Sequence, residues 1–335
     1  MKRRDFMQVL GTGLLSTMIM PGAIGRVLVQ QVSGRVPEPF NFDSEACCKL
    51  MAIGIGETTA SSIAILSKDA PYVSCHQVIF DPTGKGTDLG DLLTRLRTTD
   101  LLFLLSAFDD VACRPIFEAL GTAAGESDVL TVGIVSYRDG LLPDPRSVSS
   151  MWPVSRLSLP PFPQHAHNIT DDLSGWDRYA MRHLLVTVAD IIQRYSLICI
   201  DFADVKSIMT SGAQGSMGVG VAPIGSAQIA AIGALDRLTG QGFRITEEST
   251  LLACVRGSSA MTMDDFDDAA KVLYETFPSD SNVIASIVMD ETMGGYIKVT
   301  ILGNGNAHES SKTERALPAP VAAVPLRCQP DATFT

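Results

Sequence analysis

The chain has 335 residues, of which 46% are hydrophobic and 6% aromatic, and its formal net charge is -11. A chain of this length and apolar content can bury one large core or two ordinary ones. The negative charge argues against nucleic acid as a partner, because phosphate backbones are bound by clustered Lys and Arg. The seven cysteines are scattered without a CxxC pair, so we expect neither a disulfide framework nor a metal site.

The first 25 residues have features of a targeting segment. Arg3 and Arg4 form a twin arginine before a moderately apolar stretch, which is similar to a twin-arginine export signal. No A-x-A cleavage site follows, and Pro21 and several glycines make the stretch a poor membrane-spanning helix. Two interpretations stay open. Export would place the protein in the periplasm, whereas a basic arm that lies on the inner membrane or on the domain itself would leave it inner-membrane-associated or cytoplasmic. Residues 1–45 are therefore predicted to be a leader and linker.

Apolar runs alternate with segments of helical spacing after residue 45. Because strands that alternate with helices form parallel sheets with right-handed crossovers, this half predicts an α/β domain. The apolar runs are too continuous for a sheet with one wet face, so both faces should be covered. The predicted strands are 49–56, 76–80, 101–108 and 129–136, and the predicted helices are 57–66, 89–96 and 115–124.

The second half begins with a Pro- and Ser-rich segment, residues 141–176, which contains one candidate strand at 154–160. A long amphipathic helix is predicted at 177–194, where the apolar residues share one face. Beyond it, strands are predicted in 243–258, 282–291 and 296–304, with a helix at 262–277. The last two strands are expected to be neighbours joined by a glycine-containing turn. Residues 306–335 lack apolar periodicity and are predicted to be disordered.

Four aspartates near the start of the helix at 262–277 could suggest a calcium site. Their position instead suits carboxylates that stabilise the positive end of a helix dipole. The four residues are Asp264, Asp265, Asp267 and Asp268.

The segment CIDFADVKSIM, from Cys199 to Met209, follows the long helix and carries two carboxylates, Asp201 and Asp204. Such a short acidic turn suits holding a water or a cation against something outside the chain. Several segments then resemble the FtsZ/tubulin superfamily in the same order: KLMAIGIG, DLLFLLSAF, VLTVGIVS, IDFADVKSIM, GSMGVGVA and GYIKVTILGNG. The resemblance covers roughly Lys49 to Gly305.

The resemblance implies an FtsZ/tubulin-like α/β fold with two domains. A Rossmann-like parallel-sheet domain of the nucleotide-binding type would span residues 46–196, with its central helix at 177–194. This helix would join it to a smaller α+β domain at 197–305.

The family's GTP-binding motifs are degraded in this chain. Where the family has a glycine-rich phosphate loop, Asp109 to Pro115 contains no glycine and two carboxylates, which would repel phosphates. Gly54 and Gly56 remain in the first glycine turn, but Glu57 follows them. Gly54, Gly56 and Arg114 are thus candidate residues of a degenerate nucleotide site. GTP or GDP binding is disfavoured, and we expect a pseudo-GTPase and not an active enzyme.

The acidic segment retains more of the family pattern. The resemblance implies that Asp201 and Asp204 act in trans on GTP held by a neighbouring subunit, although Cys199 stands where the family has Asn. Cys199, Phe202 and Lys206 are candidate interface residues. The structural alternative is that IDFADV only caps the long helix and seats Phe202 at the domain junction.

The acidic face keeps the family pattern, whereas the nucleotide face is degraded. We therefore predict that the chain associates head to tail with FtsZ or with another copy of itself, and that this association caps or regulates a filament. The process would be cell division or membrane remodelling. Two alternatives stay open: a divergent, self-polymerising GTPase, and an exported or membrane-tethered scaffold without enzymatic activity.

Overall fold

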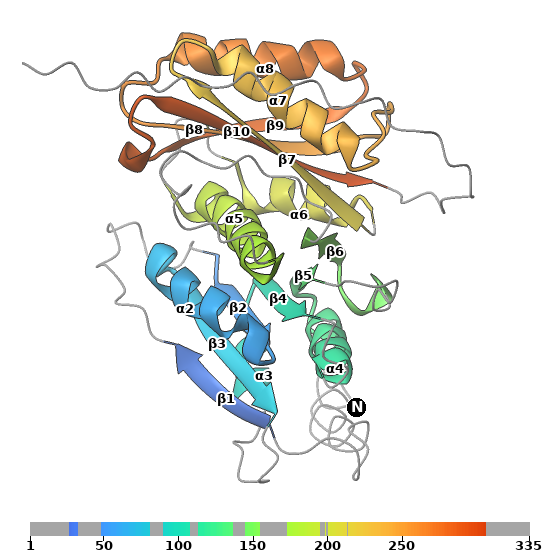
Figure 1. The fold of residues 1–335 in the computed structure, drawn as a ribbon. Helices are drawn as coiled ribbons and strands as arrows, with labels where there is room; N and C mark the ends of the chain where they lie inside the picture. The colour runs from blue at the N-terminus through green and yellow to red at the C-terminus, as the bar shows by residue number, and fades with distance from the viewer. Residues whose placement is uncertain are drawn as a thin grey trace, which may run out of the picture.

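The computed structural model describes residues 27–32, 48–80, 90–107, 113–136, 145–154, 173–194, 198, 200–212 and 214–305. Within these residues ten strands form one mixed sheet in the order β1-β3-β2-β4-β5-β6-β7-β10-β8-β9 (Figure 1). The predicted leader, the predicted tail and most of the segment corresponding to the family's phosphate loop lie outside the described residues.

The first half of the sheet is parallel, as the sequence predicted, from β3 through β2, β4 and β5 to β6, and β6 pairs in parallel with β7, the first strand of the second half. Helices α3 and α4 cover one face, and α2 with the central helix α5 covers the other. The strands are β2 (Leu50–Ile55), β3 (Val73–Phe80), β4 (Leu101–Ala107), β5 (Leu130–Ser136), β6 (Ser150–Pro153) and β7 (Gln214–Pro223). The helices are α2 (Ala60–Asp69), α3 (Gly90–Leu96), α4 (Cys113–Glu126) and α5 (Leu173–Gln193), with short 3-10 turns η1 (Glu57–Thr59) and η2 (Pro145–Ser147).

Two strands in this half differ from the sequence predictions. β1 (Val27–Val32) lies in the segment assigned to the linker and pairs antiparallel with the outer edge of β3. Its VLVQQV sequence has the valine content that favours strands. β6 occupies residues 150–153, just before the strand expected at 154–160, whose residues 155–160 lie outside the described part.

The second half is built around β10 (Tyr296–Gly305), which runs antiparallel to both β7 and β8. The expectation that the last two strands are neighbours is wrong, because β8 separates β9 from β10. β9 is parallel to β8, as a crossover through α8 requires, so β10 takes the other edge of β8. The remaining elements are α6 (Phe202–Thr210), α7 (Ala227–Gly240), β8 (Thr250–Gly257), α8 (Met263–Thr276), β9 (Asn282–Met289) and the 3-10 turn η4 (Glu291–Met293).

Figure 1 shows α7 and α8 together on one face of this half and α5 on the other. α7, which the sequence analysis did not predict, lies so close to β7 that only glycine fits at Gly218 and Gly220. α8 begins with a capping box between Thr262 and Asp265, and Asp264 and Asp265 lie in its first turn, which confirms their expected helix-start position.

The two halves share a hydrophobic core around α5. Met181, Leu184, Leu185 and Val188 on this helix are buried in a core shared with β4, β5, β8 and β10. The strand ladder contributes little at this point, since β6 and β7 are paired only through Met151 and Gln214. No helix in the described part of the chain has the length and apolar character needed to cross a bilayer.

Candidate functional site

The two ends of α5 lie at opposite edges of the parallel sheet. Near its start, the carboxylate of Asp177 accepts a hydrogen bond from Ser136, the last residue of β5. Beyond its end, Lys206 of α6 reaches Asp128, which precedes β5, with 3.4 Å between Nζ and Oδ1. A helix of 21 residues is about 30 Å long. The predicted site residues that the structure describes therefore fall into two separate groups at opposite ends of the parallel strands.

The first group lies at the carboxyl edge of the sheet, where β2 turns into η1. Gly56 has a φ of 85°, which favours glycine. Its N–H donates to the carbonyl of Val78 at 2.9 Å, and its carbonyl accepts from Gln77 Nε2 at 2.6 Å and Thr59 Oγ1 at 2.9 Å. The chain's own buried side chains thus hold this turn, and the exposed Glu57 follows directly.

Gly54 is required by packing beneath the same turn. A Cβ at this position would lie 2.5 Å from Ile63 Cγ1, 2.6 Å from Gln77 Oε1 and 2.8 Å from Thr59 Oγ1. The space next to Gly54 is filled by side chains of the protein itself. Packing within the fold is therefore enough to explain why glycine occupies position 54, and no bound nucleotide is needed to explain it.

Arg114 lies in the first turn of α4, following β4 at the same edge. Its Nε is 3.1 Å from Glu118 Oε1, one helical turn later, and both side chains are more than a third exposed. Such surface pairs contribute little to stability. The carboxylate nevertheless competes with any anion that the guanidinium would bind. Asp109 and Asp110 lie outside the described residues.

The second group is the acidic segment at the amino edge of the sheet. Asp201 is exposed and extended, and its carboxylate accepts a hydrogen bond from the backbone N–H of Asp204 at 2.8 Å. Asp201 therefore caps α6. The structural alternative had expected this segment to cap the long helix α5, so that part of it is wrong. Phe202 is half-buried against the core around α5, as that alternative also expected. Cys199 lies outside the described residues.

Replacing Asp201 by alanine should lower the free energy of unfolding by about 1 kcal/mol, because the α6 cap is lost. Asp201→Asn should be nearly neutral, since an asparagine side chain caps equally well. Urea denaturation of the two variants measures the difference. Equal losses in both variants would mean that the carboxylate charge, and not the cap, provides the stabilisation.

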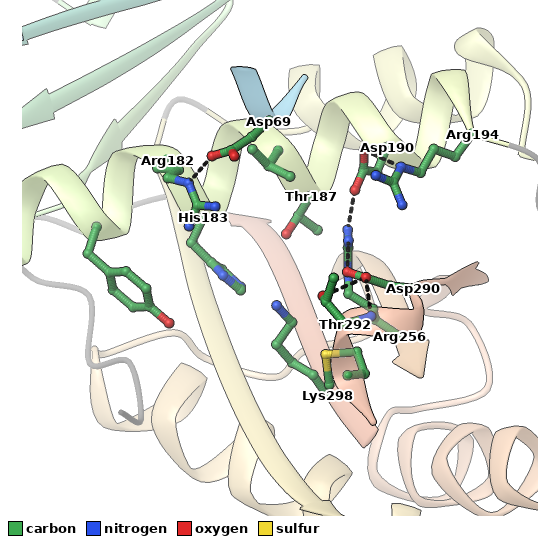
Figure 2. A pocket seen from close by; sticks show the side chains of 13 residues that line it. Asp69, Arg182, His183, Thr187, Asp190, Arg194, Arg256, Asp290, Thr292 and Lys298 are labelled. Atoms are coloured by element: carbon green, nitrogen blue, oxygen red, sulfur yellow. Dashed lines mark hydrogen bonds and ion pairs between the residues drawn. The ribbon is translucent and has the colours of Figure 1, made fainter. Parts of the chain in front are cut away.

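A buried charge cluster between α5 and the second half of the sheet was not predicted (Figure 2). The carboxylate of Asp190 is 2.6 Å from Arg256 Nη2 and 3.1 Å from Arg194 Nε, and it also accepts a hydrogen bond from Tyr72. Arg256 Nη1 is 3.1 Å from Asp290 Oδ2. The sequence did contain a signal for this cluster, namely two charged residues in apolar surroundings. Asp190 lies on the buried face of a predicted helix, and Arg256 lies in the apolar strand LLACVRG.

Burial and hydrogen bonding shift the protonation equilibria in this cluster. Burial raises the pKa of the Tyr72 hydroxyl, and the neighbouring Asp190 carboxylate raises it further. Burial also tends to raise the pKa of Asp290, but hydrogen bonds from Thr292 and the charge of Arg256 outweigh it and hold this pKa below its usual value. The cluster therefore keeps Asp290 ionised and the Tyr72 phenol neutral at physiological pH.

Known proteins resemble this chain in sequence, although no protein-family model matches it. Cell division protein FtsZ 1 of Rhizobium meliloti (strain 1021) is 25% identical over 267 residues, which cover 72% of this chain. Cell division protein FtsZ of Bartonella bacilliformis is 24% identical over 236 residues, or 65% of this chain. The alignments span only 45% and 39% of these relatives, so the chain matches less than half of their length.

Solved structures show the same architecture. A point mutant of FtsZ from M. jannaschii superposes with a TM-score of 0.60 at 16% identity, covering 77% of this chain and 91% of that one. An empty FtsZ dimer from M. jannaschii gives 0.61 at 14%, covering 78% and 89%. A GTPγS-bound CetZ2 protofilament from Haloferax volcanii gives 0.53 at 12%, covering 77% and 93%.

These comparisons and the sheet order define an α/β protein of the tubulin type. The chain has the fold of the FtsZ/tubulin superfamily and is similar in sequence to FtsZ proteins.

Proposed function

We propose that this protein docks on one end of an FtsZ-type filament and caps or regulates it, having lost the usual GTP binding. The observation that carries the proposal is the difference between the two ends of α5. At one end, Asp201 and Asp204 form an ordered helix start with the Asp201 carboxylate exposed to a partner. At the other end, buried Thr59 and Gln77 hold the glycine turn.

The degraded edge also lacks the chemistry that phosphates need. Anion-binding loops present several backbone N–H groups, which glycines leave accessible. The sequence from Asp109 to Pro115 has no glycine and adds two carboxylates, and the exposed Glu57 adds a third negative charge at the first turn. A neighbour's acidic loop would find no nucleotide to act on here.

Head-to-tail association needs two complementary faces on every subunit. A subunit with only the acidic face can join a filament but cannot receive the next subunit, so it ends growth. Relatives described as an FtsZ dimer and a CetZ2 protofilament support association of this fold into assemblies. The proposed partner is therefore an FtsZ-type filament, and a second copy of this chain is the alternative.

Light scattering and electron microscopy of GTP-loaded FtsZ from the same cell test the proposal. Full-length protein added below the FtsZ concentration should shorten the filaments. The double variant Asp201→Asn/Asp204→Asn should lose this effect, because it keeps the helix cap but removes both charges. Asp267→Asn, on the exposed face of α8, is the matched control. Filaments of unchanged length, or a double variant as active as the wild type, would refute the capping role.

Titration of GTP into the protein separates this proposal from the divergent-GTPase alternative. We expect no saturable binding in the concentration range where an FtsZ-type GTPase saturates. Tight GTP binding, followed by polymerisation of the protein alone, would instead support a self-assembling GTPase.

A further inference from the structure

A cavity of about 320 Å³ lies between α5 and the second half of the sheet, beside the buried charge cluster. Its walls come from α5 on one side and from β8, β10 and η4 on the other (Figure 2). A volume of this size is at the lower end of the range for small-molecule sites. The cavity therefore has room for a small metabolite.

Positive groups outnumber carboxylates in the cavity walls. The carboxylates are already engaged by arginines: Asp69 pairs with Arg182, and both Asp190 and Asp290 pair with Arg256. When Lys298 is protonated, the lining has four cations against three carboxylates: Arg182, Arg194, Arg256 and Lys298 against Asp69, Asp190 and Asp290. This excess favours an anionic ligand.

Lys298 brings its amine into this space from β10. Alternate residues of the strand, Ile297 and Val299, face α7 and α8, whereas Lys298 and Thr300 face α5. Figure 2 shows the Lys298 amine, the His183 ring and the Thr187 hydroxyl pointing toward one another inside the cavity. These three groups can converge on one bound oxyanion, since an amine and a hydroxyl both donate hydrogen bonds and imidazole can donate one.

We propose that this cavity binds a small organic dianion, a dicarboxylate or a phosphate ester, with Lys298 as its principal contact and with His183 and Thr187 completing the site. The ligand would touch α5 and β10 together and so tie the two halves of the molecule. The inference is independent of the filament role proposed above.

The protonation of Lys298 provides a signature for such a site. Burial and then the charge of Arg256 lower the pKa of the Lys298 amine to about 7. A bound dianion favours the protonated amine, so binding takes up a proton and the affinity falls as pH rises above 7. The charged or titratable groups around Lys298 are Asp69, Tyr179, Arg182, His183, Asp190, Arg194, Cys254, Arg256 and Asp290.

Isothermal titration of the full-length protein with succinate, glycerol 3-phosphate and sulfate tests the site. Sulfate keeps its charge over the whole range, so any pH effect on its binding comes from the protein. At least one organic dianion should bind, and sulfate, if it binds, should follow the same pH trend. The affinity should fall roughly tenfold between about pH 6.5 and about pH 8.5. Comparison of the first two probes shows whether the natural ligand is a dicarboxylate or a phosphate ester.

Lys298→Met should weaken binding at least tenfold and remove most of the pH dependence. Lys271→Met is the matched control, because Lys271 is an exposed lysine of α8 far from the cavity lining. Should Lys298→Met fail to show a cooperative thermal transition, Thr187→Val provides the second test, and it should weaken binding several-fold. The proposal is overturned if no dianion binds at tens of millimolar, if a folded Lys298→Met or Thr187→Val variant binds like the wild type, or if affinity is independent of pH.

Discussion

Replacing Arg256 by methionine is expected to lower the free energy of unfolding by about 3–5 kcal/mol, as is typical when one partner of a buried ion pair is removed. The Asp190 side chain is fully buried, with 0% of its surface exposed, and Arg256 is its buried partner at 2.6 Å. Methionine fills much of the volume of the arginine but leaves the carboxylate without this charge. Chemical denaturation monitored by circular dichroism measures the loss.

Arg194→Met is the matched control for this prediction. Arg194 also contacts Asp190, at 3.1 Å, but its side chain is 39% exposed. Exposed partners contribute about 1 kcal/mol or less, because water screens the interaction and solvates the carboxylate after the change. A loss in Arg194→Met as large as that in Arg256→Met would show that burial does not determine the strength of this cluster.

Gly220→Ala is expected to destabilise the protein by about 3 kcal/mol or more, at the upper end of overpacking effects. A Cβ at this position would lie 1.8 Å from the carbonyl oxygen of Ala230 and 2.8 Å from the backbone nitrogen of Ala234. Both atoms belong to the backbone of α7, so no side-chain rotation relieves the clash. The helix would have to move away from β7 and expose the small buried residues between them.

Gly240→Ala tests whether the cost belongs to this close approach. Gly240 is the last residue of α7, and nothing lies within 4 Å of a Cβ added there. Alanine favours helix over glycine by up to about 1 kcal/mol, so this variant should be neutral or slightly stabilised. Thermal unfolding of both variants gives the comparison. Similar melting temperatures for Gly220→Ala and the wild type would contradict the packing argument.

Continuous apolar runs made the strands of the first half predictable. Residues 101–107 and 130–136 are buried throughout or nearly so. Such short, almost entirely apolar runs are typical of strands covered on both faces of a parallel sheet. β6 was missed because SMWP is short and lies in a Pro- and Ser-rich segment. The false pairing of β9 with β10 has another cause, since a turn between two runs does not reveal that a third strand lies between them.

The candidate site was predictable only where it is local in sequence. Asp201 and Asp204 are close enough that a helix cap follows from their spacing and type. Arg256 and Asp190 are 66 residues apart, and their contact depends on how β8 crosses α5. Lys298 was not singled out in the sequence, because a lysine between buried Ile297 and Val299 does not show which helix it faces.

Among the described residues, only one pair, Met151 and Gln214, connects β6 to β7. The ten strands therefore form one sheet, but the ladder between its two halves is very short. Side-chain packing around α5 therefore joins the two halves where the hydrogen-bonded ladder is short. The acidic segment follows the end of this helix, and the cationic cavity lies along its flank. The acidic segment and the cavity are therefore both attached to α5, the element around which the two halves pack.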